Sequence, residues 1–306
     1  LNTMCTQSVS GTAIEVDLQK FFHKFTLQSI GEIGFGVDLG CLTKDVPFET
    51  SFDLATRMSA SRFRDALFWK IKRWFTTKGI HISPREKKLQ HSLQVIKDFA
   101  NEIIHSRREL SLQDLDKKTD LLSRFMVLKT NDGKPYSDDF LRSVITNFIL
   151  AGRDTTANCL SWLFYMLAKN SRVEEVVRGE IAENFGIGAN REQPTFNGLR
   201  TANMPYLHAT ITETLRLYPS VPVDVKACVG DDILPSGIKV FAGWNIAYMP
   251  YAMGRMKQIW GEDAEEFRPE RFLTKLSSDH EQRWEFNKPS PFKLTAFQAG
   301  KRLCLG

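Results

Sequence analysis

The chain has 306 residues, of which 42% are hydrophobic and 25% are charged, as is usual for a soluble globular protein. Its net charge of +5 is too small to indicate nucleic-acid binding, although it allows a basic patch for an acidic partner or an anionic membrane surface. The five cysteines are scattered and show no C-x-x-C spacing, which argues against a disulfide framework or a structural zinc site.

The first third of the chain is predicted to be mostly helical. Residues 14–36 carry apolar side chains at helical spacing. Residues 57–88 are basic and aromatic, which fits either a helix with a solvated basic face or a surface that dips into the membrane interface. Residues 84–110 predict a second long helix, and we expect the polar residues 117–120 after it to be exposed.

The longest helix is predicted over residues 137–170, which gives a length of roughly 50 Å at 1.5 Å per residue. Ser137 can cap its start. The helix is apolar nearly all round and should therefore be buried. Charged side chains at Arg142, Arg153 and Asp154 argue against a membrane span.

The sequence AGRDTT, residues 151–156, lies in the middle of this predicted helix. An Asp-Thr-Thr run in a helix would by itself indicate local bonds from side chains to the backbone. A functional interpretation of this motif depends on the cysteine loop at the end of the chain, which is described below.

The second half of the chain is predicted to contain helices and then a small β region. Residues 171–185 and 206–217 show helical periodicity, and Glu213 and Arg216 share a face of the second helix. Taken alone, that pair is an ordinary exposed ion pair. Two β-branched runs, 221–234 and 238–247, predict a hairpin, followed by a short helix at 251–260. An irregular, proline-containing stretch that includes the sequence PERF then leads to the last residues.

The last ten residues, FQAGKRLCLG, place one cysteine between two glycines. A Cys304 thiolate on such a loop can bind haem iron as an electron-donating axial ligand. Gly300 and Gly306 lack a Cβ, so the backbone can lie close to a flat macrocycle. Arg302 is placed to pair with a haem propionate, and Phe297 can shield the sulfur from water. The alternative is a buried structural cysteine beside a glycine turn.

Three motifs in this order resemble the cytochrome P-450 family of haem-thiolate monooxygenases: A/G-G-x-D/E-T, E-x-x-R followed by P-E-R-F, and F-x-x-G-x-R-x-C-x-G. The resemblance implies a mainly α fold with a small β region, a long central helix over the haem and the cysteine loop at the C-terminal end. It covers residues 1–306, which would form a partial catalytic domain. The family's membrane anchor, its early helices and the helix after the cysteine loop are expected outside this sequence.

The resemblance also assigns roles to individual residues. Cys304 would be the iron ligand of a haem b, and Asp154 and Thr155 would be catalytic by delivering protons for O₂ activation. Gly152 would let the long helix open locally and leave room for dioxygen and water. Further residues expected to contact the cofactor are Arg302, Phe297, Gly300, Gly306, Ala151 and Gly152. A buried structural triad is expected from Glu213, Arg216 and Arg271.

The implied function is insertion of one atom of O₂ into a C–H bond of a lipophilic substrate. Electrons would come from NADPH through a flavoprotein reductase, at the cytosolic face of the endoplasmic reticulum membrane. AGRDTT together with LYPSVP resembles the plant and microbial branch that hydroxylates fatty acids near the chain end. One alternative is a family member that rearranges hydroperoxides, which the Asp154–Thr155 pair argues against. Another is an inactive, truncated haem-binding or interaction protein.

Overall fold

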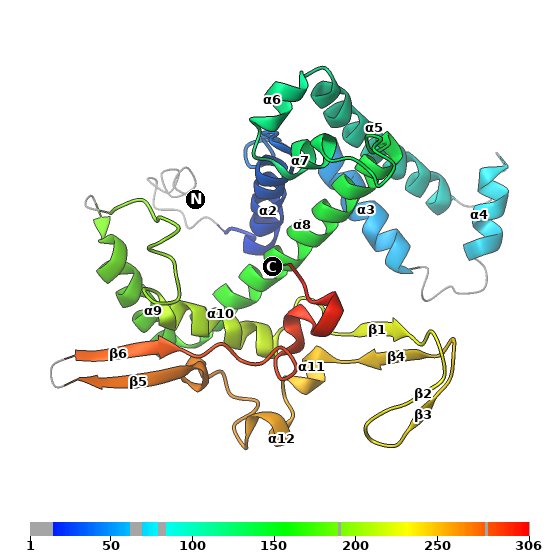
Figure 1. The fold of residues 1–306 in the computed structure, drawn as a ribbon. Coiled ribbons are helices and arrows are strands. Elements are labelled where there is room, and N and C mark those ends of the chain that lie inside the picture. The colour runs from blue at the N-terminus through cyan, green and yellow to red at the C-terminus, as the bar shows by residue number, and fades with distance from the viewer. Residues whose placement is uncertain (1–14, 62–68, 79–83, 189–190, 279–280, 306) are drawn as a thin grey trace. The chain divides into compact units, whose positions relative to one another are not determined.

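A computed structural model describes residues 15–61, 69–78, 84–188, 191–278 and 281–305 (Figure 1). The chain divides into two compact units, Leu1–Ala157 and Asn158–Gly306, and helix α8 (Asp138–Lys169) runs from the first into the second. The fold is mainly helical with short antiparallel strands, which confirms the predicted fold class. None of the described helices is both long and apolar enough to cross a membrane.

The described part of the first unit is helical. Its helices, besides the N-terminal part of α8, are α2 (Leu18–Phe35), α3 (Pro47–Ser61), α4 (Trp69–Thr77), α5 (Pro84–Arg108), α6 (Leu112–Asp116) and α7 (Leu121–Val127). Helices α2, α5 and α8 confirm the three long helices predicted around residues 14–36, 84–110 and 137–170. Asp17 caps α2 by accepting a hydrogen bond from the backbone N–H of Lys20 at 3.0 Å.

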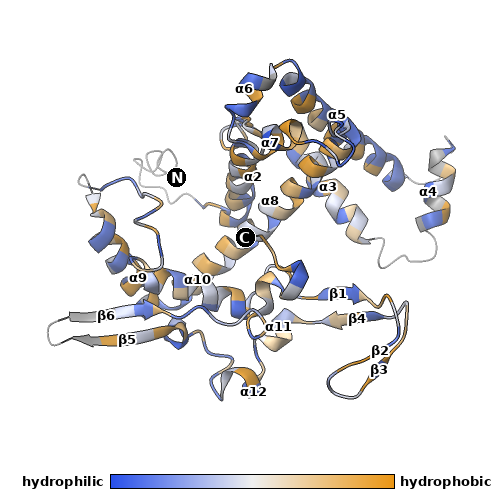
Figure 2. Ribbon diagram, in the orientation of Figure 1, coloured by the Kyte–Doolittle hydropathy of each residue, from blue (hydrophilic) through white to orange (hydrophobic). Residues whose placement is uncertain are grey.

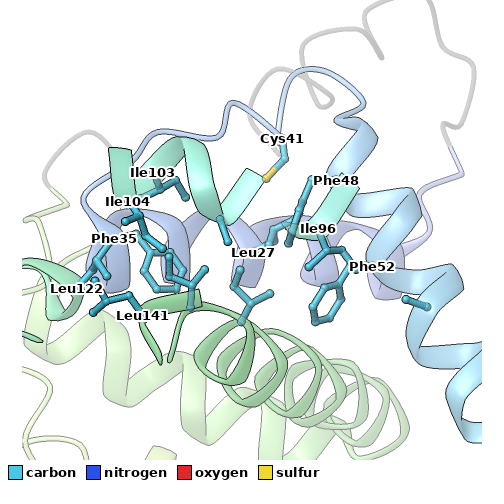
Figure 3. Packing of buried hydrophobic residues seen from close by; sticks show 14 of the residues in the cluster. Leu27, Phe35, Cys41, Phe48, Phe52, Ile96, Ile103, Ile104, Leu122 and Leu141 are labelled. Atoms are coloured by element: carbon cyan, nitrogen blue, oxygen red, sulfur yellow. The ribbon is translucent and has the colours of Figure 1, made fainter. Parts of the chain in front are cut away.

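One apolar cluster holds the helices of the first unit together (Figure 3). It draws on α2, α3, α5, α7 and α8, and its labelled members are Leu27, Phe35, Cys41, Phe48, Phe52, Ile96, Ile103, Ile104, Leu122 and Leu141. Helix α5 contributes one stripe to this cluster, and Figure 2 shows hydrophilic and hydrophobic colour alternating along it. Burial of these side chains is the main force that stabilises the unit.

Asp120 departs from the expectation that residues 117–120 are exposed. Its carboxylate is buried, caps α7 by accepting from the backbone N–H of Ser123 at 2.9 Å, and lies 3.8 Å from the Arg107 guanidinium. Arg107 also donates to the carbonyl oxygens of Phe35 and Gly36. The polar sequence therefore marks a helix start and a buried ion pair instead of a solvated loop.

The described residues of the second unit form two further long α-helices, two short ones and three two-stranded antiparallel ribbons. The helices are α9 (Ser171–Phe185), α10 (Pro205–Leu217), α11 (Pro250–Met253) and α12 (Lys257–Trp260). The strands are β1 (Asp224–Ala227), β2 (Asp232–Ile233), β3 (Lys239–Val240), β4 (Asn245–Tyr248), β5 (Leu273–Ser278) and β6 (Glu281–Phe286). Helices α9 and α10 confirm the predicted ones, and α11 and α12 divide the short helix that was expected as one.

The predicted hairpin is confirmed. It consists of two consecutive pairs of antiparallel strands, with the inner pair next to the turn. β1 pairs with β4, with Val225 opposite Ala247, and β2 pairs with β3, with Asp232 opposite Val240. The turn between them is closed by a 2.9 Å hydrogen bond from the N–H of Leu234 to the carbonyl oxygen of Ile238.

The β5–β6 hairpin was not predicted, because that stretch was expected to be irregular. Lys275 lies opposite Trp284 and Leu273 opposite Phe286. The strands carry few β-branched residues, and Leu273, Trp284 and Phe286 instead pack on the buried clusters of α9 and α10. Tertiary packing therefore decides this hairpin, which sequence periodicity cannot reveal.

The start of α10 is capped by a side chain from another helix. Its own N-cap residue, Met204, forms no side-chain cap. Glu180 of α9 accepts from the backbone N–H groups of Tyr206 and Leu207, each at 2.8 Å. Burial raises the pKa of Glu180, although the two N–H donors act in the opposite direction.

We expect Glu180→Ala to lower the free energy of unfolding by about 1 to 2 kcal/mol, because two N–H groups at a helix start lose their acceptor. Chemical denaturation measures this. The matched control is Glu183→Ala on the exposed side of the same helix, which should change the stability by less than about 0.5 kcal/mol. Equal effects of the two substitutions would contradict the capping role.

Candidate functional site

The AGRDTT motif places a buried arginine between two carboxylates of the first unit. Arg153 is 1% exposed, and its Nη1 lies 2.5 Å from Asp53 Oδ1 on α3 and 3.1 Å from Asp154 Oδ1. The Thr26 hydroxyl of α2 donates to the Arg153 carbonyl oxygen at 2.9 Å. Asp154 is thus held beside a permanent positive charge, because a guanidinium does not deprotonate in proteins.

Thr155 is oriented by the helix that carries it. Its hydroxyl donates to the Ala151 carbonyl oxygen, one turn earlier, at 2.5 Å. Asp154 and Thr155 are both half-buried, whereas Ala151 is exposed. The two predicted catalytic side chains are therefore neighbours with accessible polar atoms on one turn of α8.

Gly152 has a packing role that the sequence did not indicate. Helix α8 continues as an unbroken α-helix through this residue. A Cβ at Gly152 would lie 2.9 Å from Cδ1 of Ile30 on α2, so the glycine admits that side chain against the helix. Local opening of the helix at Gly152, expected for dioxygen and water, is absent from the described structure.

The cysteine loop in the second unit is bent back on itself. Gln298 and Gly300 both have a left-handed backbone, with φ of 63° and 72°. The N–H of Cys304 then donates to the Phe297 carbonyl oxygen at 2.9 Å and closes the loop. Left-handed φ is unusual for a residue other than glycine, and here Gln298 also accepts a hydrogen bond from Lys226 Nζ at 3.0 Å.

This loop presents Cys304 at the surface of its unit, among apolar side chains. Cys304 is a free, exposed cysteine, so its sulfur is accessible in the described structure. Phe297, Leu303 and Leu305 are exposed beside it, Leu305 to 95%. Arg302 is exposed as well, and Gly306 lies outside the described residues.

The structure brings Glu213, Arg216 and Arg271 together. Glu213 is 0% exposed, and Arg216 donates to it twice, from Nε at 2.6 Å and from Nη2 at 2.8 Å. Arg271 of the PERF segment donates from Nε to Glu213 Oε1 at 2.9 Å. Burial lowers the pKa of Arg271, but Glu213 and Asp263 more than offset this and raise it, so the arginine stays charged.

Arg216 satisfies the rest of its donors on an irregular segment. It donates to the carbonyl oxygens of Gly254, Ala264 and Glu266, the last two at 2.5 and 2.9 Å. Together with the two bonds to Glu213, all five N–H donors of the guanidinium are used. The pair is therefore a buried organising centre and not the exposed ion pair that E-x-x-R alone would indicate.

Comparison with known proteins assigns the chain to a family. The sequence profile described as Cytochrome P450 matches residues 2–306. The chain belongs to the cytochrome P450 family. The resemblance inferred from the three motifs is thereby confirmed.

Plant members of the family are similar to the chain. It is 41% identical to cytochrome P450 86B1 of Arabidopsis thaliana, over 95% of this chain and 52% of that protein. It is 38% identical to cytochrome P450 704C1 of Pinus taeda, over 96% and 58%, and 39% identical to cytochrome P450 94C1 of Arabidopsis thaliana, over 95% and 55%. The chain thus spans between about half and three fifths of the length of these relatives.

The cofactor of this family is a haem whose iron is bound by a cysteine thiolate. The donor set of the loop fits that group. Cys304 offers an accessible sulfur, and exposed apolar side chains flank it. Among the described residues, no heavy atom other than those of Gly300 and its two chain neighbours lies within 4 Å of the position that a Gly300 Cβ would take. An exposed arginine, Arg302, stands two residues before the sulfur as a partner for a carboxylate.

Several residues that support these motifs were not predicted by sequence analysis. Asp53, which pairs with Arg153, lies 100 residues away in sequence, and His23 of α2 lies 3.5 Å from Asp154. In the second unit, Glu270 of the PERF segment accepts from the Tyr206 hydroxyl at 2.6 Å and from Arg172 at 2.5 Å. Single polar residues with partners so distant in sequence carry no local pattern that would reveal them.

We expect Glu213→Ala and Arg271→Ala each to lower the free energy of unfolding by roughly 3 to 5 kcal/mol, because each strands a buried charge of opposite sign. Soluble yield and chemical denaturation measure this. Glu265→Ala, on an exposed residue of the same segment, is the control and should behave like the wild type. Normal stability of both triad variants would show that the buried network is dispensable.

Glu270 leads to a pH-dependent prediction. Burial raises its pKa, but hydrogen bonds from Arg172 and Tyr206 outweigh this and hold the pKa of Glu270 below its ordinary value. A depressed carboxyl pKa stabilises the folded state above the unfolded-state value, about 4.3, and this contribution is lost as pH falls through the folded-state value. Glu270→Gln should therefore be clearly less stable than the wild type at pH 7, and the gap should narrow below about pH 4.

Urea denaturation at several pH values tests this prediction. Glu285→Gln is the matched control, because Glu285 is exposed on β6 and should show no such gap. A stability gap for Glu270→Gln that stayed constant from pH 7 to pH 3 would mean that ionisation of this carboxyl does not matter.

Proposed function

We propose that this chain is part of a haem-thiolate monooxygenase that inserts one oxygen atom of O₂ into a C–H bond of a fatty acid. The observation that carries the proposal is the exposed Cys304 thiol on a loop closed by the Cys304–Phe297 backbone bond, in a member of the cytochrome P450 family. The substrate class rests on the resemblance of AGRDTT and LYPSVP to the fatty-acid hydroxylating branch of the family, and the plant relatives are in keeping with it.

When bound, the haem supplies the activation of dioxygen, and the protein supplies binding, orientation and electrostatics. Cys304 Sγ would hold the iron as a thiolate. Arg302 would pair with a propionate, and Phe297 would keep water from the sulfur. The left-handed turn at Gly300 lets the backbone pass close to a flat group, because a side chain there would be strained.

Asp154 and Thr155 would supply protons. The Thr155 hydroxyl is already oriented by the Ala151 carbonyl oxygen, and Asp154 Oδ1 is fixed by Arg153. The two groups would act as a relay through water, in which a protonated Asp154 carboxyl gives up its proton and Thr155 Oγ1 accepts a proton as its own O–H proton is passed on. Arg153 orients Asp154 and takes no part in the transfer, because it keeps its own protons.

The proposed setting is the cytosolic face of the endoplasmic reticulum membrane, with NADPH electrons delivered by a flavoprotein reductase. Helix α4 supports contact with a membrane surface. Ile71 and Trp74 are about half exposed there, with Lys70 and Arg73 also exposed on the same short helix. Tryptophan together with basic side chains suits the headgroup region of a bilayer.

The iron ligand is tested by Cys304→Ser in the haem-loaded protein. Loss of the thiolate should remove the characteristic Soret shift of the reduced, CO-bound protein, because a serine oxygen donates less electron density to iron. Cys228→Ser, at a partly buried cysteine of the same unit, is the control and should keep the shift. A persistent shift in Cys304→Ser would refute the assignment.

The substrate class is tested by titrating the haem-loaded protein with medium- and long-chain fatty acids. Displacement of water from the iron should move the haem from low to high spin, which absorption spectroscopy records. Product analysis with a reductase and NADPH should then find hydroxylated fatty acids. If fatty acids produced no spin shift while sterols or terpenoids did, the fatty-acid assignment would be wrong.

A further inference from the structure

The outer side of the AGRDTT motif opens into a charged hollow in the first unit. Its volume is about 530 Å³, and residues of α2, α3 and α8 line it, with Asp154 of α8 among them. The hollow is large enough for many water molecules, and its polar lining offers them partners. Asp154 therefore has access to solvent from a side that the proposed function has not yet used.

His23 of α2 lines this hollow beside Asp154. Its Nδ1 is buried, has no hydrogen-bond partner among the described residues and lies 3.5 Å from Asp154 Oδ1. The side chain is nevertheless 23% exposed, so its exposed area belongs to atoms other than Nδ1, and the residue lines the hollow. One edge of the imidazole thus faces Asp154 while another part of the ring meets solvent.

The other charged groups around His23 come from three elements and the loop before α3. Lys20 lies on α2 and Asp17 caps that helix, Asp45 precedes α3, and Arg153 accompanies Asp154 on α8. From α3 come Glu49, Asp53 and Arg57. Of these side-chain types, imidazole is the one that ordinarily gains and loses a proton near neutral pH.

Arg153 cannot replace the histidine in this position. Its guanidinium keeps its protons, and its Nη1 contacts both Asp53 of α3 and Asp154. Nε and Nη2 of Arg153 are buried without a partner among the described residues, which marks a polar interior that water can complete.

We infer that His23 is a positioning residue of the proton supply, passing protons from water in this hollow to Asp154. In the step, the Nδ1–H bond of the imidazolium breaks and an O–H bond forms on the Asp154 carboxylate. The neutral imidazole keeps its other proton on Nε2, so Nδ1 is the nitrogen to be recharged. A rotation of the ring brings Nδ1 from Asp154 to the hollow, where it takes a proton from hydronium and leaves a water molecule. The 3.5 Å separation shortens to a hydrogen bond by a small rotation of either side chain, as acid–base pairs often do on reaction. This inference rests on the proposed monooxygenase function.

The test compares wild type with His23→Gln, which keeps a polar side chain but cannot carry the proton. The quantity measured is the fraction of oxidised NADPH that appears as hydroxylated product, from pH 6 to pH 8.5. The wild-type fraction should fall as pH rises, because a neutral imidazole has no proton on Nδ1 to give to Asp154. The His23→Gln fraction should be lower by about tenfold at pH 6 and flat with pH, a smaller loss than direct acid–base groups cause.

Two controls separate proton supply from packing. His105→Gln, at an exposed histidine of α5, should keep the wild-type profile. His23→Asn is a second substitution in case His23→Gln yields little protein, and all rates are referred to the amount of thiolate-bound, CO-reactive haem. A His23 variant that kept the wild-type pH profile would overturn the inference, even if its stability had changed.

A readout independent of activity uses protein labelled with ¹⁵N in its histidines. The ring signals of His23, assigned by their loss in His23→Gln, should shift in Asp154→Asn and stay in place in Asp132→Asn, which alters an exposed carboxylate. Unchanged His23 signals in Asp154→Asn would show that the two side chains are not in contact and would overturn the inference.

The activity measurements separate this inference from the proposed function. Wild-type protein with a thiolate CO band but no hydroxylation would overturn both. Active wild-type protein together with unaffected His23 variants would overturn the inference alone.

Discussion

The second unit is organised around one guanidinium. Arg216 sits at 1% exposure, and its five donors reach both oxygens of Glu213 and three carbonyl oxygens of the segment from Gly254 to Glu266. A charge so deeply buried is tolerated because every donor is satisfied and the opposite charge is adjacent. Glu213 in turn accepts from the backbone N–H of Arg268 and from Arg271, so the route of the chain toward β5 is set by the same two side chains.

Charge is used differently in the first unit. There the core is an apolar cluster, and the ionic groups that matter gather around the AGRDTT motif. Arg153 is shared by Asp53 and Asp154, and His23 meets Asp154 from another helix. Asp154 can exchange one hydrogen-bonding partner for another, because Arg153 and His23 both lie beside it. Such a carboxylate suits the proposed transfer of protons. The Glu213 carboxylate, enclosed by arginines, suits a structural role instead.

Sequence reasoning predicted what depends on neighbouring residues. Helix α8 follows from continuous helical periodicity, and the closeness of Glu213 and Arg216 follows from their spacing of three. Sequence reasoning could not predict contacts that depend on tertiary packing. The Glu180 cap on α10, the Asp53–Arg153 pair and the β5–β6 hairpin are of this kind. The local helix opening expected at Gly152 was transferred from family resemblance, and Ile30 packs against that glycine instead.

The hydrogen bonds from the Arg216 guanidinium to three carbonyl oxygens also restrict the length of the segment that carries those carbonyls. Gly254, Ala264 and Glu266 must each bring a carbonyl oxygen to the same guanidinium, and a Cβ at Gly254 would clash with the Arg216 carbonyl. Inserting or deleting a single residue between Gly254 and Ala264 would draw at least one oxygen away and leave a buried N–H without an acceptor. Loops usually vary freely in length among relatives, but this irregular segment should be as intolerant of insertions as the interior of a helix.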